Sequence, residues 1–197
     1  MKFKGPVKKK YSFLRKKKYC LGKYCLIPIR RKDIQKIRKW RNDQIDVLRQ
    51  TKPLTVEDQI RYYNNEITRS FYDKEPNMIL FSFLFKDLCI GYGGLVHINW
   101  HSKRAEISII IQTERNQKLN VYRKDFRAFF LLIKKLAFEE LELNRLVTET
   151  YEIRPHVIKL LREMKFKLEG RMKKHVKIKG IYVDSLMHGC LKNSIKK

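Results

Sequence analysis

A group of cations surrounds the start of a predicted long helix. Residues 105–111 read as a buried, β-branched strand, and a polar loop over residues 112–120 follows it. After the loop, apolar residues recur at the spacing of one buried helical face, and the N-terminus of such a helix can bind an anion. The basic side chains near this point could bind a phosphate or could be a solvated helix face: Arg115, Lys118, Arg123 and Lys124.

Two histidines, His97 and His101, are four residues apart. That spacing places two ligands on one face of a helix, but these residues fall on a predicted strand and the turn after it. We therefore predict surface roles for them and no metal site.

The elements that would position these groups follow from hydrophobic patterning. Strands are predicted at 25–29, 78–85, 90–100, 105–111, 144–151, 166–178 and 181–191. Helices are predicted at 34–42, from a capping box at 55–58 to 68, after the loop as a long helix whose apolar positions run from 126 to 141, and from Pro155. The order is β-α-α-β-β-β-α-β-α-β-β. It predicts a mixed α/β fold, with a mostly antiparallel central sheet flanked by helices and a ligand crevice at its one β-α-β crossover.

The charge of the chain points to an anionic partner. The formal net charge is +26, and ten basic residues fall within the first 24 positions, with Tyr11, Phe13, Tyr19 and Tyr24 among them. Such a segment could bind single-stranded nucleic acid or could be a solvated tail, and a lysine-rich genome could also account for the charge. We predict a flexible basic extension over residues 1–24 and a single domain over residues 25–193.

The cysteines and the apolar segments bear on location. Four scattered cysteines include no C-x-x-C pair, so we expect free thiols in a reducing compartment, either the cytoplasm or an organellar matrix. No apolar run reaches membrane-spanning length and no signal-like apolar segment follows the basic start. We therefore expect no membrane partner and no secretory signal.

Several short stretches, in this order, resemble the GCN5-related N-acetyltransferase (GNAT) superfamily, in the branch of ribosomal-protein alanine and amino-sugar acetyltransferases. They are residues 40–42 (WRN), 90–94 (IGYGG), 104–107 (RAEI), 137–146 (AFEELELNRL) and 166–171 (FKLEGR). The resemblance covers about residues 26–191. It implies a GNAT-like acyl-CoA N-acyltransferase fold, with acetyl-CoA as co-substrate and a primary amine as acceptor.

Two departures from the family pattern stand out. The glycine positions of the family's pyrophosphate loop carry Tyr122, Lys124 and Phe126, and no glycine occurs from 112 to 138. Side chains there should crowd a phosphate, unless the cations named above replace the backbone contacts. The hydroxyl that family members place on the helix after the fifth strand is also missing, since Val157 and Leu161 stand there. His156 and Tyr182 are the nearest substitutes as proton donors.

The resemblance implies direct attack of a neutral amine on the thioester. Glu106 is the first candidate for the base, or it could be a structural carboxylate paired with Arg104 or Arg41. The strand backbone around Ile109, Ile110 and Ile111 would bind the cofactor and polarise its carbonyl. The acceptor side would be lined by Trp40, Arg41, Asn42 and Glu149. Arg41 and Arg49 could hold a phosphate or carboxylate of the acceptor.

A second class of function stays open. A domain with eroded cofactor glycines, no hydroxyl acid and a charge of +26 could be a catalytically degenerate RNA- or ribosome-binding component. The sequence does not identify the acceptor among amino sugars, small molecules and protein N-termini, and it does not give the oligomeric state.

Overall fold

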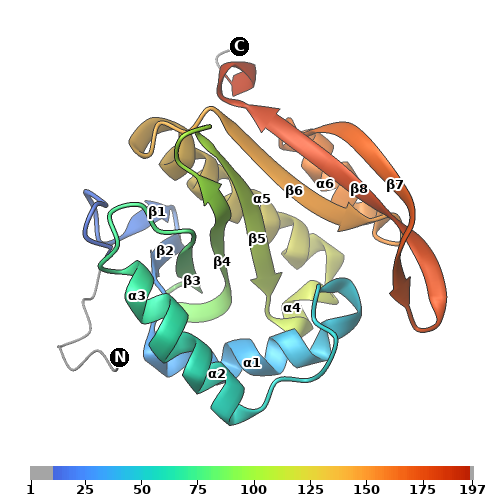
Figure 1. Ribbon diagram of the computed structural model, residues 1–197, viewed down its shortest axis with the longest axis horizontal. Helices are drawn as coiled ribbons and strands as arrows, with labels where there is room; N and C mark the ends of the chain where they lie inside the picture. The colour runs from blue at the N-terminus through green and yellow to red at the C-terminus, as the bar shows by residue number, and fades with distance from the viewer. Residues whose placement is uncertain (1–10, 196–197) are drawn as a thin grey trace.

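The computed structural model describes residues 11–195, and within them the strands form one eight-stranded sheet in the order β1-β2-β3-β4-β5-β6-β8-β7 (Figure 1). Every neighbouring pair is antiparallel except β5 and β6, which are parallel. The mixed α/β fold predicted from the sequence is therefore confirmed. The strands are β1 (Tyr19–Leu21), β2 (Tyr24–Pro28), β3 (Ile79–Phe85), β4 (Leu88–Asn99), β5 (Arg104–Ile111), β6 (Arg145–Tyr151), β7 (Lys167–Ile178) and β8 (Ile181–Leu191).

The helices begin and end near the predicted positions. They are α1 (Ile34–Asp43), α2 (Val56–Tyr62), α3 (Thr68–Ser70), α4 (Thr113–Asn116), α5 (Leu119–Lys135) and α6 (Pro155–Glu163), with 3-10 turns at Arg31–Asp33, Ile45–Val47 and Lys192–Ile195 and π turns at Tyr63–Ile67 and Leu136–Glu140. The capping box of α2 is present, because Thr55 and Asp58 each accept a hydrogen bond from the other's backbone N–H. The predicted loop at 112–120 is wrong in part, since α4 and the first residues of α5 occupy much of it.

The helices cover both faces of the sheet, and the alternation along β4 shows how. Gly93 lies under α5, where an added Cβ would be 2.8 Å from the ring of Phe129. The next residue back, Tyr92, points to the other face and accepts a hydrogen bond from Arg41 of α1. Successive residues of a strand face opposite sides, so α1 and α5 lie on opposite faces. Figure 1 shows α5 and α6 behind the sheet and α1 and α2 in front of its lower end.

Aromatic packing fixes α5 against the sheet. Phe126, Phe129 and Phe130 are nearly inaccessible, and Phe129 meets Phe83 of β3 edge to face at 5.3 Å. Phe126 stacks on Phe130 with centroids 4.1 Å apart. Such pairs add to the free energy of burial, so the start of α5 is held firmly beside β5.

The expected basic extension over residues 1–24 is wrong from Tyr11 onward. Tyr11 is fully buried between Phe71 and Phe81, and its hydroxyl donates to the carbonyl of Leu80 and accepts from its N–H. Residues 19–21 add β1 to the edge of the sheet. The aromatic residues among the lysines therefore anchor this segment to the domain. Residues 1–10 lie outside the described part of the chain.

The expectation of free thiols is wrong for two of the four cysteines. Cys20 and Cys25 face each other across the β1–β2 hairpin, with Cα atoms 4.1 Å apart, and form a disulfide. Cys89 and Cys190 are free and buried. The pairing follows from the hairpin register, which the cysteine spacing alone does not reveal. Among the described residues, no helix is long and apolar enough to cross a membrane.

Candidate active site

The parallel strands β5 and β6 separate partway along their length and leave a cleft through the sheet. They pair only from Arg104–Glu106 against Arg145–Val147. Beyond that point a cavity of about 320 Å³ is lined by side chains from both faces. The α5 face contributes Tyr122, Phe126, Phe130, Arg154, Val157 and Leu161, and the α1 face contributes residues that include Arg41, Leu48, Arg49, Tyr62, Glu106, Glu149 and Tyr151.

Polar groups without partners line the middle of this cleft. Thr150 is 5% exposed, and its hydroxyl is buried without a hydrogen-bond partner in the described structure. The hydroxyl of Thr148 donates to the carbonyl of Ile107, so the odd-numbered residues of β5 direct their backbone groups toward β6. Ile109, which also lines the cavity, follows in the same register after the strands have separated. The cleft therefore offers a strand edge and a hydroxyl to a polar ligand.

The three predicted cofactor-binding isoleucines divide by face. Ile109 lines the cavity on the α5 face, whereas Ile110 is buried opposite Tyr92 on the α1 face. Ile111 is buried, and its carbonyl accepts a hydrogen bond from Gln44.

The residues at the family's glycine positions fill the space beside the cleft. Tyr122 is buried in the second turn of α5, packs on Phe126 and His156, and receives a 3.4 Å hydrogen bond from Arg154. Burial raises the pKa of Tyr122, so its hydroxyl stays protonated. Phe126 also lines the cavity, whereas Lys124 is exposed and lines a separate surface groove with Arg123.

Of the four cations predicted to bind phosphate, none lines the cleft. Arg115 makes a bidentate ion pair with the fully buried Asp125 and lies over Phe85, which makes it a structural residue. Arg123 bonds Glu163 of α6, and Lys118 is exposed at the start of α5. The cation that lines the cavity on the α5 face is Arg154, which forms no ion pair within the described residues. Arg154 was not among the cations predicted to bind phosphate.

Two glutamates and one arginine form an ion cluster on the α1 face. Arg49 contacts Glu106 at 3.0 Å and also bonds Glu149, which accepts a further hydrogen bond from Ser185. Burial opposes ionisation of Glu149, but the bonds from Ser185 and Arg49 outweigh it and hold its pKa below the usual value. The partner of Glu106 is therefore Arg49, and the sequence analysis named Arg104 and Arg41 instead.

The three acceptor-side residues predicted on α1 have different roles. Trp40 is buried in the core, and Asn42 fixes the chain by hydrogen bonds to both backbone groups of Leu54. Arg41 lines the cleft, where it bonds the hydroxyl of Tyr92 and the side chain of Gln50. Only Arg41 of the three is in reach of a ligand there, because helical periodicity turns its neighbours away.

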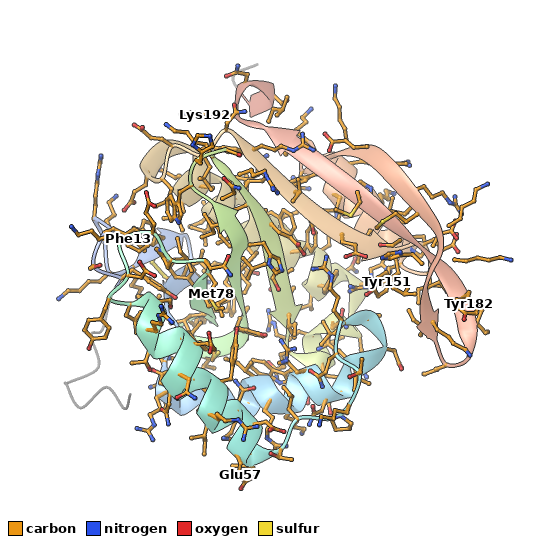
Figure 2. All side chains as sticks on the ribbon, viewed as in Figure 1. Phe13, Glu57, Met78, Tyr151, Tyr182 and Lys192 are labelled. Atoms are coloured by element: carbon orange, nitrogen blue, oxygen red, sulfur yellow. A yellow bond between two sulfur atoms is a disulfide. The ribbon has the colours of Figure 1, made fainter. Side chains whose placement is uncertain are left out.

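The predicted proton donors lie outside the cleft. Tyr182 is 59% exposed and does not line the cavity, and Figure 2 shows it at the outer end of the β7–β8 hairpin. His156 packs on Tyr122, and burial together with the charge of Arg154 lowers its pKa. A residue that the sequence analysis missed, Tyr151, lines the cleft and is 6% exposed. Burial, reinforced by Glu149, raises its pKa, which keeps the phenol protonated.

The described residues contain no group of three or more histidine, cysteine, aspartate or glutamate side chains placed to hold a metal ion. His97 adopts a positive φ of 50° at an irregularity in β4 and lines the cleft, and His101 is exposed in the following turn.

Comparisons with known proteins agree with this architecture. A family model described as "Acetyltransferase (GNAT) domain" matches residues 26–187. A spermidine N-acetyltransferase from Vibrio cholerae, solved with CoA and spermine, has a TM-score of 0.76 at 20% identity, over 88% of this chain and 98% of that one. A dodecameric form of the V. cholerae enzyme has a TM-score of 0.73 at 22% identity, over 90% and 98%.

Mutant forms of the V. cholerae spermidine/spermine N-acetyltransferase have a TM-score of 0.72 at 23% identity, over 88% of this chain and 96% of that one. A search of curated protein sequences finds no match. At these identities the solved structures establish the fold. The family model spans most of the chain, and with it the acyl donor, acetyl-CoA, is established. This protein belongs to the GNAT acetyltransferase family and is an acetyl-CoA-dependent N-acetyltransferase.

Proposed function

We propose that this protein acetylates a primary amine by direct attack on the thioester inside the cleft between β5 and β6. The observation that carries the proposal is the cavity itself, which is lined from both faces of the sheet. A donor bound from the α5 face and an acceptor bound from the α1 face would meet in it. No covalent enzyme intermediate is needed, since proximity supplies much of the rate.

The donor side would use groups of this chain that have no partner. Acetyl-CoA supplies the activated acetyl thioester. The free edge of β5 at Ile109 and the unpartnered hydroxyl of Thr150 fit the amide groups of such a ligand. Tyr122 and Phe126 occupy the positions where glycine loops bind pyrophosphate, so Arg154 is the residue that would pair with phosphate instead.

The acceptor side would use the carboxylates. An amine attacks only in its neutral form, so a group in the cleft must take its proton. Glu106 is the proposed base, because its side chain is 17% exposed and is held by Arg49 at the point where the strands separate. Glu149 is a poorer base, since a carboxylate with a lowered pKa accepts a proton less readily.

Tyr151 is the proposed proton donor to the leaving thiolate. It takes the place of the hydroxyl that the family carries on the helix after the fifth strand, where Leu161 stands here. Its raised pKa keeps the phenol protonated, so that its hydroxyl can donate to the sulfur as negative charge develops there.

The alternative of an RNA- or ribosome-binding component has less support. No comparison points to it, and several of the cations on α5 and its approach are paired internally: Arg115 with Asp125, and Arg123 and Arg127 with Glu163. Such pairs leave less free charge for phosphate contacts.

A thiol-release assay with acetyl-CoA and a panel of primary amines tests the proposal. We expect amine-dependent release of CoA thiol in the parent protein and a large loss in Glu106→Gln. The exposed Glu139→Gln is the matched control. Binding of CoA, measured by calorimetry, should be unchanged in both variants. Binding of CoA without turnover of any amine would contradict the proposed function.

A further inference from the structure

We infer that the acceptor carries a negatively charged group, a carboxylate or a phosphate, which Arg41 binds on the α1 face. The inference rests on the proposed function and narrows its substrate class. It separates this chain from its structural relatives that act on spermidine, a polycation.

Arg41 is the cation of the acceptor side that lacks a counter-ion. Its guanidinium bonds two uncharged groups, the hydroxyl of Tyr92 at 2.5 Å and the amide oxygen of Gln50 at 3.1 Å. Among the described residues it forms no ion pair. Those two bonds orient the group at the wall of the cleft and leave further N–H donors for an oxyanion.

The two carboxylates of the same face already share an arginine. Glu106 and Glu149 both bond Arg49, and Glu149 also accepts from Ser185. An acceptor with several ammonium groups would have to displace Arg49 to find a carboxylate. An acceptor with one amine and one anionic group needs no such displacement, because its anionic group can pair with Arg41, which has no counter-ion among the described residues.

The rim of the acceptor side is basic as well. The end of the β7–β8 hairpin reaches the segment after α1, where Lys179 bonds Asp46 at 2.9 Å (Figure 1). Residues 171–182 of that hairpin include five lysines or arginines. Arg171 pairs with Glu152 and Asp184, and Lys179 pairs with Asp46, whereas the other three form no ion pair among the described residues: Lys173, Lys174 and Lys177. This rim would repel a polyamine and attract an anion.

The test compares amines that differ only in the anion. The pairs are glucosamine with glucosamine 6-phosphate and β-alaninamide with β-alanine, and spermidine is the polycation. We expect the anionic member of at least one pair to have a kcat/KM about tenfold higher, the effect of one charge-assisted hydrogen bond. The two pairs separate a phosphate from a carboxylate.

Arg41→Gln should remove that preference through KM, with kcat nearly unchanged, because the anion is remote from the reacting amine. Lys36→Gln removes the same charge from an exposed position of α1 and should keep the preference. Equal kcat/KM within both pairs, a preference for spermidine, or an unchanged preference in Arg41→Gln would overturn the inference and leave the proposed function standing. If the parent protein turns over none of these amines, both the inference and the proposed function are contradicted.

Discussion

Tyr151 faces the cleft at the end of β6, where the charges of Glu149, Arg49 and Arg154 act on its hydroxyl. A phenol in this position can donate a proton only while it is protonated, and burial favours that state. The same burial makes the residue a packing element of the cleft wall, so a variant must separate the two roles.

Tyr151→Phe removes the hydroxyl and keeps the ring. We expect kcat to fall about 100-fold or more, the usual contribution of a positioned acid, while binding of CoA by calorimetry stays the same. Tyr182→Phe makes the same change at an exposed site and should leave kcat unaltered. A kcat within a factor of about two of the parent in both variants would exclude Tyr151 as the donor.

Glu149 links the cleft to the pH dependence of stability. Its pKa in the folded protein lies below the usual value for a glutamate, so its stabilising contribution is present above that usual pKa and is lost as pH falls through the folded pKa. Glu149→Gln should therefore flatten the dependence of Tm on pH in the acid range. The exposed Glu139→Gln should not, and equal acid profiles for the two variants would contradict the assignment.

The position of a single residue could be predicted where that residue lies on a strand with a clear sequence pattern. Glu106 and Glu149 lie on strands with strong hydrophobic patterns, so their positions beside the cleft followed from the order of elements. The ion pair of Arg115 could not be predicted in this way. Its partner Asp125 lies ten residues later on α5, and only the packing of the folded chain brings the two side chains together. Tyr151 was not predicted as a cleft residue, because the family pattern places its proton-donating hydroxyl on the helix after the fifth strand and Tyr151 lies at the end of β6.

Among the elements, α5 carries most of the aromatic packing against the sheet. Phe126→Ala should lower the free energy of unfolding by about 3–5 kcal/mol, the cost of emptying a filled aromatic site. Leu131→Ala, on the exposed side of the same helix, should cost less than about 1 kcal/mol. Denaturant unfolding measures both, and similar losses would mean that Phe126 is not part of the core.

The β1–β2 hairpin is closed by the Cys20–Cys25 disulfide, which spans five residues. A loop this short gains about 2 kcal/mol of stability from its crosslink in the chain-entropy model. We expect a reductant to lower the Tm of the parent protein. The same reductant should leave unchanged the Tm of a double variant that carries Cys20→Ser and Cys25→Ser. If both proteins respond equally to reductant, the disulfide does not contribute.

Most elements could be predicted because each has a clear local period. The capping box at Thr55 and the strand predicted at 90–100 rest on short-range signals, and both were confirmed, the strand as β4. The short strand β1 and the helix α4 were missed for a physical reason. Each is only three or four residues long, too short for a period, and is fixed by contacts with distant parts of the chain.

The molecule as a whole is strongly cationic, with a formal net charge of +26. Part of this charge is neutralised by ion pairs within the chain. The β7–β8 hairpin and the surface groove beside α5 still carry exposed lysines. Two anionic reactants would be drawn to such a surface.

The ionic strength should therefore govern the rate at limiting substrate. We expect kcat/KM for acetyl-CoA to fall as salt rises from about 10 mM to 150 mM, where the Debye length shortens from about 30 Å to 8 Å. With acetyl-CoA saturating, kcat/KM for an uncharged amine should change little. A flat salt profile for acetyl-CoA would mean that the surface charge does not steer it.

The cleft that runs through the sheet has a kinetic consequence. Because the cavity is lined from both faces of the sheet, donor and acceptor can be held in it at once, and neither has to leave before the other arrives. Initial-velocity lines at several fixed concentrations of the second reactant should then intersect, where a double-displacement route would give parallel lines. Either product is also free to depart first, so each should act as an inhibitor toward the reactant that shares its side.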